Sequence, residues 1–329
     1  MKNLRTLATA RRQRGMTLIE LMVALVIGLL IVVAMTAAFV GSSSSRREGV
    51  LSADVIETGR YAIDTLGREL SQAGFYGPLV VPAGATSNAG ILCARGAANI
   101  ASWQDSLPWH VVGLRSAGGA NIDADPSCIS RKVGTDAIFV QRVSTCTTAE
   151  CPDAAPADFA YMQVSECGTE YSATPTVLAQ GDSTTAFTLQ TLACDGTKAV
   201  KRKLMRRIYF VDADSNLQYQ EVTLNGALAD HKVLIAENIE QMQIEYAVDS
   251  NGDGTADSFT SSPADWTQVI GMRVWLLARS TDSSKNTKDA ASFVMADTTV
   301  DIAAAAVNPK RRLYSTYISF MTPKSRRET

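Results

Sequence analysis

An unbroken apolar run near the N-terminus constrains this chain more than any other feature. Residues 16–40 read MTLIELMVALVIGLLIVVAMTAAFV, and Glu20 is the only ionisable side chain among them. A run of about 20 apolar residues is long enough to cross a bilayer as a helix. Because a carboxylate inside hydrocarbon costs about 2.5–3.5 kcal/mol, Glu20 needs a partner that compensates for its burial.

A basic segment precedes this run and allows three interpretations. The first fifteen residues contain five cations and no acidic residue. An ordinary secretory signal has a shorter apolar core and a small-residue cleavage site after it. A plain membrane anchor explains the cations, which hold the N-terminus in the cytoplasm, but it leaves Gly15 and Glu20 unexplained. Cleavage between Gly15 and Met16 explains all of these features, because it removes the cations, keeps the helix and makes Glu20 the fifth residue.

The segment RG-MTLIELMVALVIGLL resembles the class III leader and N-terminal helix of type IV prepilins. The resemblance implies that a prepilin peptidase cleaves after Gly15 and N-methylates Met16, where the family usually has phenylalanine. It also implies that Glu20 serves assembly. In a filament core a bare carboxylate requires a cation, and the new α-amine of a neighbouring chain offers a charge-assisted hydrogen bond.

The helical pattern continues beyond the apolar run. After GSSSSRRE (41–48), apolar residues recur at three- and four-residue steps, which indicates an amphipathic helix. The residues of this stripe are Leu51, Val55, Ala62, Ile63, Leu66, Leu70 and Ala73. Gly74 is a suitable C-cap, and Gly77-Pro78 ends the element. Two separate helices broken at 41–45 are the alternative.

Two further segments narrow the resemblance to the PilW family of minor pilins. GRYAIDTLGRELSQAGFYG (59–77) is similar to the segment after the family's helix, and RRLYSTYISF (311–320) to its C-terminal strand. The resemblance implies a structural protein that primes type IV pilus assembly and sits at or near the tip, in motility, adhesion or DNA uptake. The implied partners are the prepilin peptidase, other minor pilins and the major pilin through the helix, and a large tip adhesin. The implied location is the inner membrane, single-pass with a cytoplasmic N-terminus and a periplasmic body, and then the pilus.

The remainder of the chain predicts a β-rich body. Strands are expected at 136–143 and 186–192, in a hairpin over 203–224 with DADSN as its turn, and in the segments ENIEQMQIEYAVD and VIGMRVWLLARS. The fold class is therefore α+β, with a long N-terminal helix packed on an antiparallel sheet, as in pilins. The expected parts are a leader (1–15), a transmembrane and filament-core helix (16–40), an amphipathic helix (41–77) and a periplasmic domain (78–329).

Six cysteines follow the apolar run, and none of them forms CxxC. They are Cys93, Cys128, Cys146, Cys151, Cys167 and Cys194. An even number downstream of an export segment favours three disulfides in an oxidising compartment. Sequence alone leaves the pairing open; Cys146–Cys151 and Cys167–Cys194 are the pairs we favour.

One segment, DSNGDGTAD (249–257), matches the first half of an EF-hand calcium loop. Its candidate ligands are Asp249, Asn251, Asp253, Thr255 and Asp257. The twelfth position is Thr260 instead of glutamate, and strands flank the loop. A Ca²⁺ site of another type and a solvated hairpin tip are therefore both open. No other cofactor is expected.

No catalytic motif is present, so we expect no enzyme activity. Without its first fifteen residues the chain has 26 basic and 33 acidic residues, and this charge gives no indication of nucleic-acid binding. A type II secretion pseudopilin, which shares the leader and helix, is the first alternative. A membrane-anchored periplasmic enzyme or binding domain is the second, and it would require a pocket of convergent polar groups.

Overall fold

The computed structural model describes residues 15–81, 92–117, 120, 121, 123, 127–284, 291–302 and 308–321. The chain divides into two compact units, residues 1–50 and residues 51–329. Residues 1–14, which include the five cations of the N-terminal segment, lie outside the described part of the chain. Helix α1 contributes to both units.

Helix α1 extends without a break from Leu18 to Leu70, so the alternative of two helices broken at 41–45 is wrong. The serines at 42–45 lie inside this helix. The Ser44 hydroxyl donates to the carbonyl oxygen of Gly41 at 2.9 Å, a local bond that a serine can form without leaving the helix. The helix ends before Gly74, which has φ 75°, a left-handed conformation typical of the residue after a helix.

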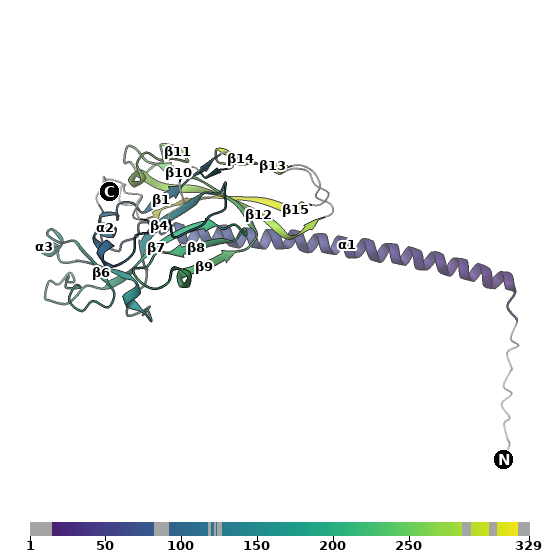
Figure 1. Ribbon diagram of the computed structural model, residues 1–329, viewed down its shortest axis with the longest axis horizontal. Coiled ribbons are helices and arrows are strands. Elements are labelled where there is room, and N and C mark those ends of the chain that lie inside the picture. The colour runs from purple at the N-terminus through teal and green to yellow at the C-terminus, as the bar shows by residue number, and fades with distance from the viewer. Residues whose placement is uncertain are drawn as a thin grey trace, which may run out of the picture. The chain divides into compact units, whose positions relative to one another are not determined.

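The body contains a seven-stranded antiparallel sheet with the order β1-β4-β7-β5-β6, and β8 joins it through β7 and β9 through β8 (Figure 1). Its strands are β1 (Val111–Leu114), β4 (Ala137–Val143), β5 (Ala160–Val164), β6 (Thr176–Gln180), β7 (Lys201–Val211), β8 (Leu217–Glu221) and β9 (Lys232–Ala236). Strand β7 is the centre of this sheet, since it pairs with β4, β5 and β8 along its length. The expected hairpin at DADSN is confirmed as β7 and β8.

A second sheet of four antiparallel strands has the order β11-β10-β12-β15. Its strands are β10 (Ile239–Val248), β11 (Ser258–Thr260), β12 (Val269–Ser284) and β15 (Asn308–Ser319). Two small hairpins complete the strands: β2 (Ser116–Ala117) with β3 (Ala120–Asn121), and β13 (Ala291–Met295) with β14 (Thr298–Ile302). The helical turns of the body are short: η2 (Ala97–Asn99), α2 (Ile100–Asp105), η3 (Pro156–Asp158), α3 (Gly168–Tyr171), η4 (Leu228–His231) and η5 (Trp266–Gln268).

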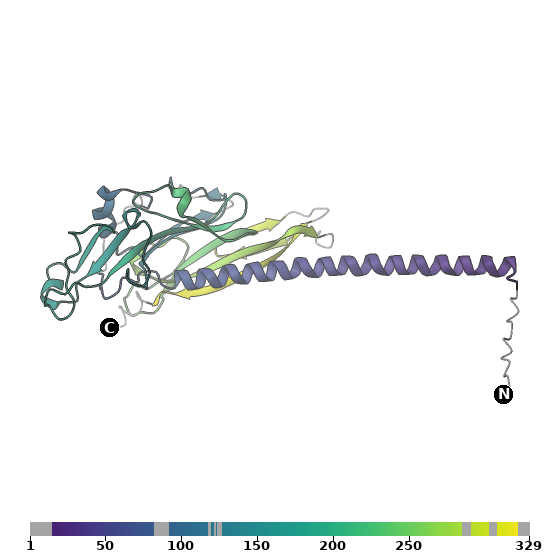
Figure 2. The same ribbon diagram turned by 90° about the horizontal axis from the view of Figure 1, so that it is seen from below.

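The second half of α1 runs along the four-stranded sheet (Figure 2). The main core joins this part of the helix to the four-stranded sheet and to residues of the seven-stranded sheet such as Ile138 and Tyr209. Every second residue of β12 from Met272 to Ala278 belongs to this core, and Ile318 of β15 joins it; Met272, Val274 and Ile318 are all less than 5% exposed. A second core, around Trp103, Phe139 and Phe210, belongs to the seven-stranded sheet. The α+β fold class is therefore confirmed.

The expected strand at 186–192 is wrong. Phe187 and Leu189 are buried with the alternation of a strand, but an isolated bridge between Gln190 and Lys198 is the only β pairing of this segment. Side chains occupy its backbone amides instead: Leu189 N donates to Gln163 Oε1 at 2.9 Å, and Gln190 N donates to Glu170 Oε2 at 2.7 Å. An amide that donates to a side chain is not available to a neighbouring strand.

The three expected disulfides are present. They join Cys93 to Cys128, Cys146 to Cys151 and Cys167 to Cys194. The last two are the pairs favoured from the sequence. The Cys167–Cys194 bond closes a loop with a sequence separation of 27, and such a cross-link stabilises the fold by restricting the unfolded chain.

Candidate assembly helix

The residues at the expected cleavage site lie outside the helix. Gly15, Met16 and Thr17 precede the first helical residue, and the Met16 side chain is 65% exposed. The peptide bond between Gly15 and Met16 is not part of the helix, so a peptidase could bind it in an extended form without first breaking helical hydrogen bonds.

Glu20 and Thr17 form a reciprocal cap at the start of α1. Glu20 N donates to Thr17 Oγ1 at 3.3 Å, and Thr17 N donates to Glu20 Oε2 at 3.4 Å. This is a capping box, in which two of the free amides of the first turn find side-chain acceptors. The T-x-x-E pattern from Thr17 to Glu20 is the sequence signature of such a cap. Glu20 thus has a structural role that does not depend on a neighbouring chain.

The apolar half of α1 is exposed throughout. Leu18, Leu25 and Leu29 are each more than 60% exposed, and residues 15–46 contain no buried position. Within the described part of the chain, α1 is the one helix that is long and apolar enough to cross a membrane. An apolar surface of this extent requires lipid or other protein to cover it.

The second half of α1 buries one face against the body. The buried positions match the predicted stripe, with the addition of Gly59. Gly59 is in contact with Tyr314 of β15: a Cβ atom there would lie 2.1 Å from the Tyr314 ring. The Tyr314 hydroxyl donates to the carbonyl oxygen of Val55 at 3.2 Å. Strand β15 therefore holds the helix through an aromatic ring that only glycine admits.

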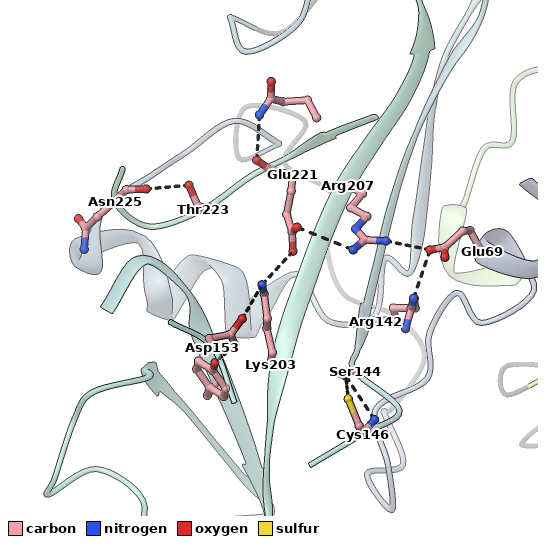
Figure 3. A network of polar contacts seen from close by, with 12 residues as sticks. Glu69, Arg142, Ser144, Cys146, Asp153, Lys203, Arg207, Glu221, Thr223 and Asn225 are labelled. Atoms are coloured by element: carbon pink, nitrogen blue, oxygen red, sulfur yellow. Dashed lines mark hydrogen bonds and ion pairs between the residues drawn. The ribbon is translucent and has the colours of Figure 1, made fainter. Parts of the chain in front are cut away.

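A charged network holds the end of α1 on the seven-stranded sheet (Figure 3). Glu69 Oε2 accepts from Arg142 Nη2 at 3.2 Å and from Arg207 Nη1 at 2.8 Å. The Tyr209 hydroxyl donates to the same oxygen at 3.3 Å. Because the two arginine side chains are only 10% and 13% exposed, their charges require a carboxylate partner.

The network continues from Arg207 across the sheet. Arg207 Nη2 lies 3.8 Å from Glu221, and Lys203 Nζ lies between Glu221 at 3.7 Å and Asp153 at 3.3 Å (Figure 3). Burial raises the pKa of Tyr209, so its phenol stays protonated and remains a donor. The alternating charges connect the helix to the loop beside the Cys146–Cys151 disulfide.

The candidate calcium loop is held by its own amides. Asp249 is buried, and its two carboxylate oxygens accept from Gly252 N at 2.6 Å and Gly254 N at 3.0 Å. Hydrogen bonds from Ser250 lower the pKa of Asp257, and the bond from the Ser250 hydroxyl has a larger effect than the bond from its amide. In the described residues no group of three or more His, Cys, Asp or Glu side chains gathers in a way that could hold a metal ion. Calcium binding stays a prediction.

The histidine nearest a core, His110, packs within the body. Its Nε2 donates to the carbonyl oxygen of Val269 at 2.7 Å, and its ring meets Phe320 edge-on at 5.4 Å. His110 directly precedes β1, Val269 begins β12 and Phe320 directly follows β15, so these contacts assign His110 to packing.

Two family models match the chain, one at each end. The prokaryotic N-terminal methylation motif matches residues 10–36. The type IV pilus-assembly protein W (PilW) family matches residues 208–321, which extend from β7 to the end of β15. This chain carries the PilW signature. No curated protein and no solved structure gives a significant match. The PilW match covers β15 with Tyr314 but only Ile208–Val211 of β7, so it includes the Tyr314 contact with α1 and leaves out Arg142 and Arg207 of the Glu69 network.

Proposed function

We propose that this chain is a structural minor pilin that primes type IV pilus assembly and sits at or near the pilus tip, with roles in motility, adhesion or DNA uptake. The observation that carries the proposal is the pairing of a methylation motif at the N-terminus with a PilW match at the C-terminus. A pilin of this kind acts by packing, so we propose no enzyme activity. Before assembly the chain would lie in the inner membrane, with a cytoplasmic N-terminus and a periplasmic body.

Processing by a prepilin peptidase is the first step of the proposed function. Cleavage between Gly15 and Met16 would remove the cations and create a new α-amine. The mass of the mature N-terminal peptide tests this step: we expect a methylated chain that begins at Met16. A chain from envelope fractions that keeps its first fifteen residues would contradict the proposal.

Assembly would follow through α1. Exposed apolar residues of the helix would leave lipid and pack against other minor pilins and the major pilin. The Glu20 carboxylate would then meet the α-amine of a neighbouring chain, and this pair would set the axial register.

Three variants separate this charge role of Glu20 from its role in the cap. Glutamine serves in a capping box as glutamate does, so Glu20→Gln keeps the cap and loses the charge. Thr17→Ala loses the cap and keeps the charge. We expect Glu20→Gln and Glu20→Ala to be equally poor at entering filaments, and Thr17→Ala to enter them. Normal incorporation of Glu20→Gln would limit Glu20 to helix capping.

Deletion of the gene tests the class of filament. We expect loss or strong reduction of surface pili with normal export of secreted enzymes. The opposite result, normal pili with defective secretion, would assign the chain to a type II secretion pseudopilus. A large adhesin at the tip is a further proposed partner, and co-purification with sheared pili tests it.

A further inference from the structure

The edge of the four-stranded sheet next to α1 carries a concentration of positive charge. A groove of about 300 Å³ lies between the helix and the first part of β15. Its lining, which we call the basic groove, consists of Ser52, Val55 and Ile56 from α1 and Lys310, Arg311 and Arg312 from β15. Three cations and no carboxylate line it, on a body whose acidic residues outnumber its basic ones.

The charges around Arg311 are only partly compensated. Arg311 pairs with Glu240 through two hydrogen bonds, at 2.5 Å and 3.1 Å. Arg279 is the register partner of Arg311 on β12, and like charges directly opposite each other destabilise a sheet. Burial raises the pKa of Glu240, but the hydrogen bond from Arg311 and the charges of Arg311, Lys132 and Arg279 outweigh burial, so this pKa lies below its ordinary value. Glu240 thus interacts with three cations, of which Lys132 also has the Asp212 carboxylate nearby.

Arg312 is the most available cation of the groove. It is exposed, and among the described residues it has no carboxylate partner; its guanidinium lies 5.8 Å from the centre of the Tyr314 ring. Asp54, a helix carboxylate next in sequence to Val55 of the groove lining, accepts from the Thr281 hydroxyl at 3.1 Å. An external anion would therefore meet a guanidinium that no internal acid neutralises.

The shape and chemistry of the basic groove favour a protein segment over other anions. Val55 and Ile56 give one wall an apolar character, which suits side chains of a peptide. Strand β15 is the last strand of its sheet in the described part of the chain, so an extended segment that paired with its outer edge would add a strand to the sheet. Arg311 donates to both carboxylate oxygens of Glu240, which is the bidentate arrangement in which guanidinium groups bind carboxylates.

We propose that the basic groove receives an acidic segment of a neighbouring pilus subunit, whose carboxylates pair with Arg312 and its neighbours. This inference rests on the proposed function, because it takes the neighbour from the filament. The groove would add a contact between bodies to the packing between helices.

Binding of a labelled hexaglutamate peptide to the full chain in a zwitterionic detergent tests the charge preference. We expect binding that weakens with salt and falls about tenfold in Arg312→Glu. Lys232→Glu is the matched control, because Lys232 is also an exposed cation on an edge strand. Absence of binding to the wild-type chain, or an equal loss in the control, would overturn the proposal.

A photo-crosslinking residue at position 312 identifies the occupant in cells, with position 232 as the control. We expect an adduct with another pilin, joined at a peptide rich in Asp or Glu. An adduct with an anionic lipid, or none, would overturn the proposal. If pili require the chain and hexaglutamate does not bind, the groove fails and the proposed function stands; if deletion leaves pili intact, the proposed function itself fails.

Discussion

The contact between Gly59 and Tyr314 gives the sharpest test of how α1 is held on the body. A methyl group at position 59 would lie 2.1 Å from Tyr314 Cε2 and 2.6 Å from Cδ2 and Cζ. Such distances are too short for any side chain, so the ring or the helix must move. Gly59→Ala should therefore separate the helix from the sheet at this point.

The expected magnitude follows from three contributions. Overpacking of a close contact costs about 1–3 kcal/mol, and displacement of the Tyr314 hydroxyl from Val55 costs about 1 kcal/mol. Alanine in place of glycine inside a helix returns about 0.5–1 kcal/mol. We expect Gly59→Ala to lower the free energy of unfolding of the body by about 1–3 kcal/mol. Gly67→Ala is the matched control: the same helix offers open space there, so it should be stabilising by about 0.5–1 kcal/mol.

Chemical unfolding of the full chain in detergent, followed by tryptophan fluorescence, measures both variants. Tyr314→Ala in the Gly59→Ala background provides a further check, because removal of the ring should abolish the penalty of the added methyl group. If Gly59→Ala is as stable as Gly67→Ala, the ring does not hold the helix and the reasoning is wrong.

Three further predictions concern the body. Burial raises the pKa of Asp136 to about 6, above its value in the unfolded chain. Between these two pKa values the folded state binds more protons than the unfolded state, so the contribution of Asp136 to the free energy of unfolding should fall by about 3 kcal/mol as pH rises from about 4 to about 6. Urea unfolding across this range should show that slope in the wild type and lack it in Asp136→Asn. Glu69→Gln should lower the free energy of unfolding by about 1–3 kcal/mol, because Arg142 and Arg207, which are poorly exposed, lose their carboxylate partner. Glu57→Gln, at an exposed position of the same helix, is the control and should change this free energy by less than about 0.5 kcal/mol. Asp249→Ala should be destabilising by about 1–3 kcal/mol because the amides of Gly252 and Gly254 lose their acceptors, and EDTA should leave the wild-type melting temperature unchanged; calorimetric heat at millimolar calcium is the result that would establish a Ca²⁺ site.

Regular patterns in the sequence predicted the regular parts of the fold. The stripe from Leu51 to Leu70 and the alternation in β12 follow from local periodicity, and both are buried as expected. Alternation failed at 186–192, because burial of Phe187 and Leu189 does not determine what their amides bond to. A side-chain acceptor from elsewhere in the chain leaves no local signal.

The candidate site shows the same division. A local motif predicts the roles of Gly15, Met16 and Glu20, which stay predictions, and the T-x-x-E pattern is the signature of the cap that Thr17 forms. The Glu69 network was not predictable, because its partners Arg142 and Arg207 lie 73 and 138 residues away. The basic groove was not predictable for the same reason, since its two walls come from α1 and β15, and Ser52 and Lys310 are 258 residues apart.

The place of β15 in the chain has a consequence for synthesis. This strand, which supplies Tyr314 and pairs with β12 from Gly271 to Ser284, is made last, while the helix that it grips is made first. A nascent polypeptide thus contains the whole of α1 long before it contains the strand that binds the second half of this helix. A product that lacks β15 would keep the apolar half of α1 but lose the Tyr314 contact, so limited proteolysis should distinguish it from a chain that has this strand.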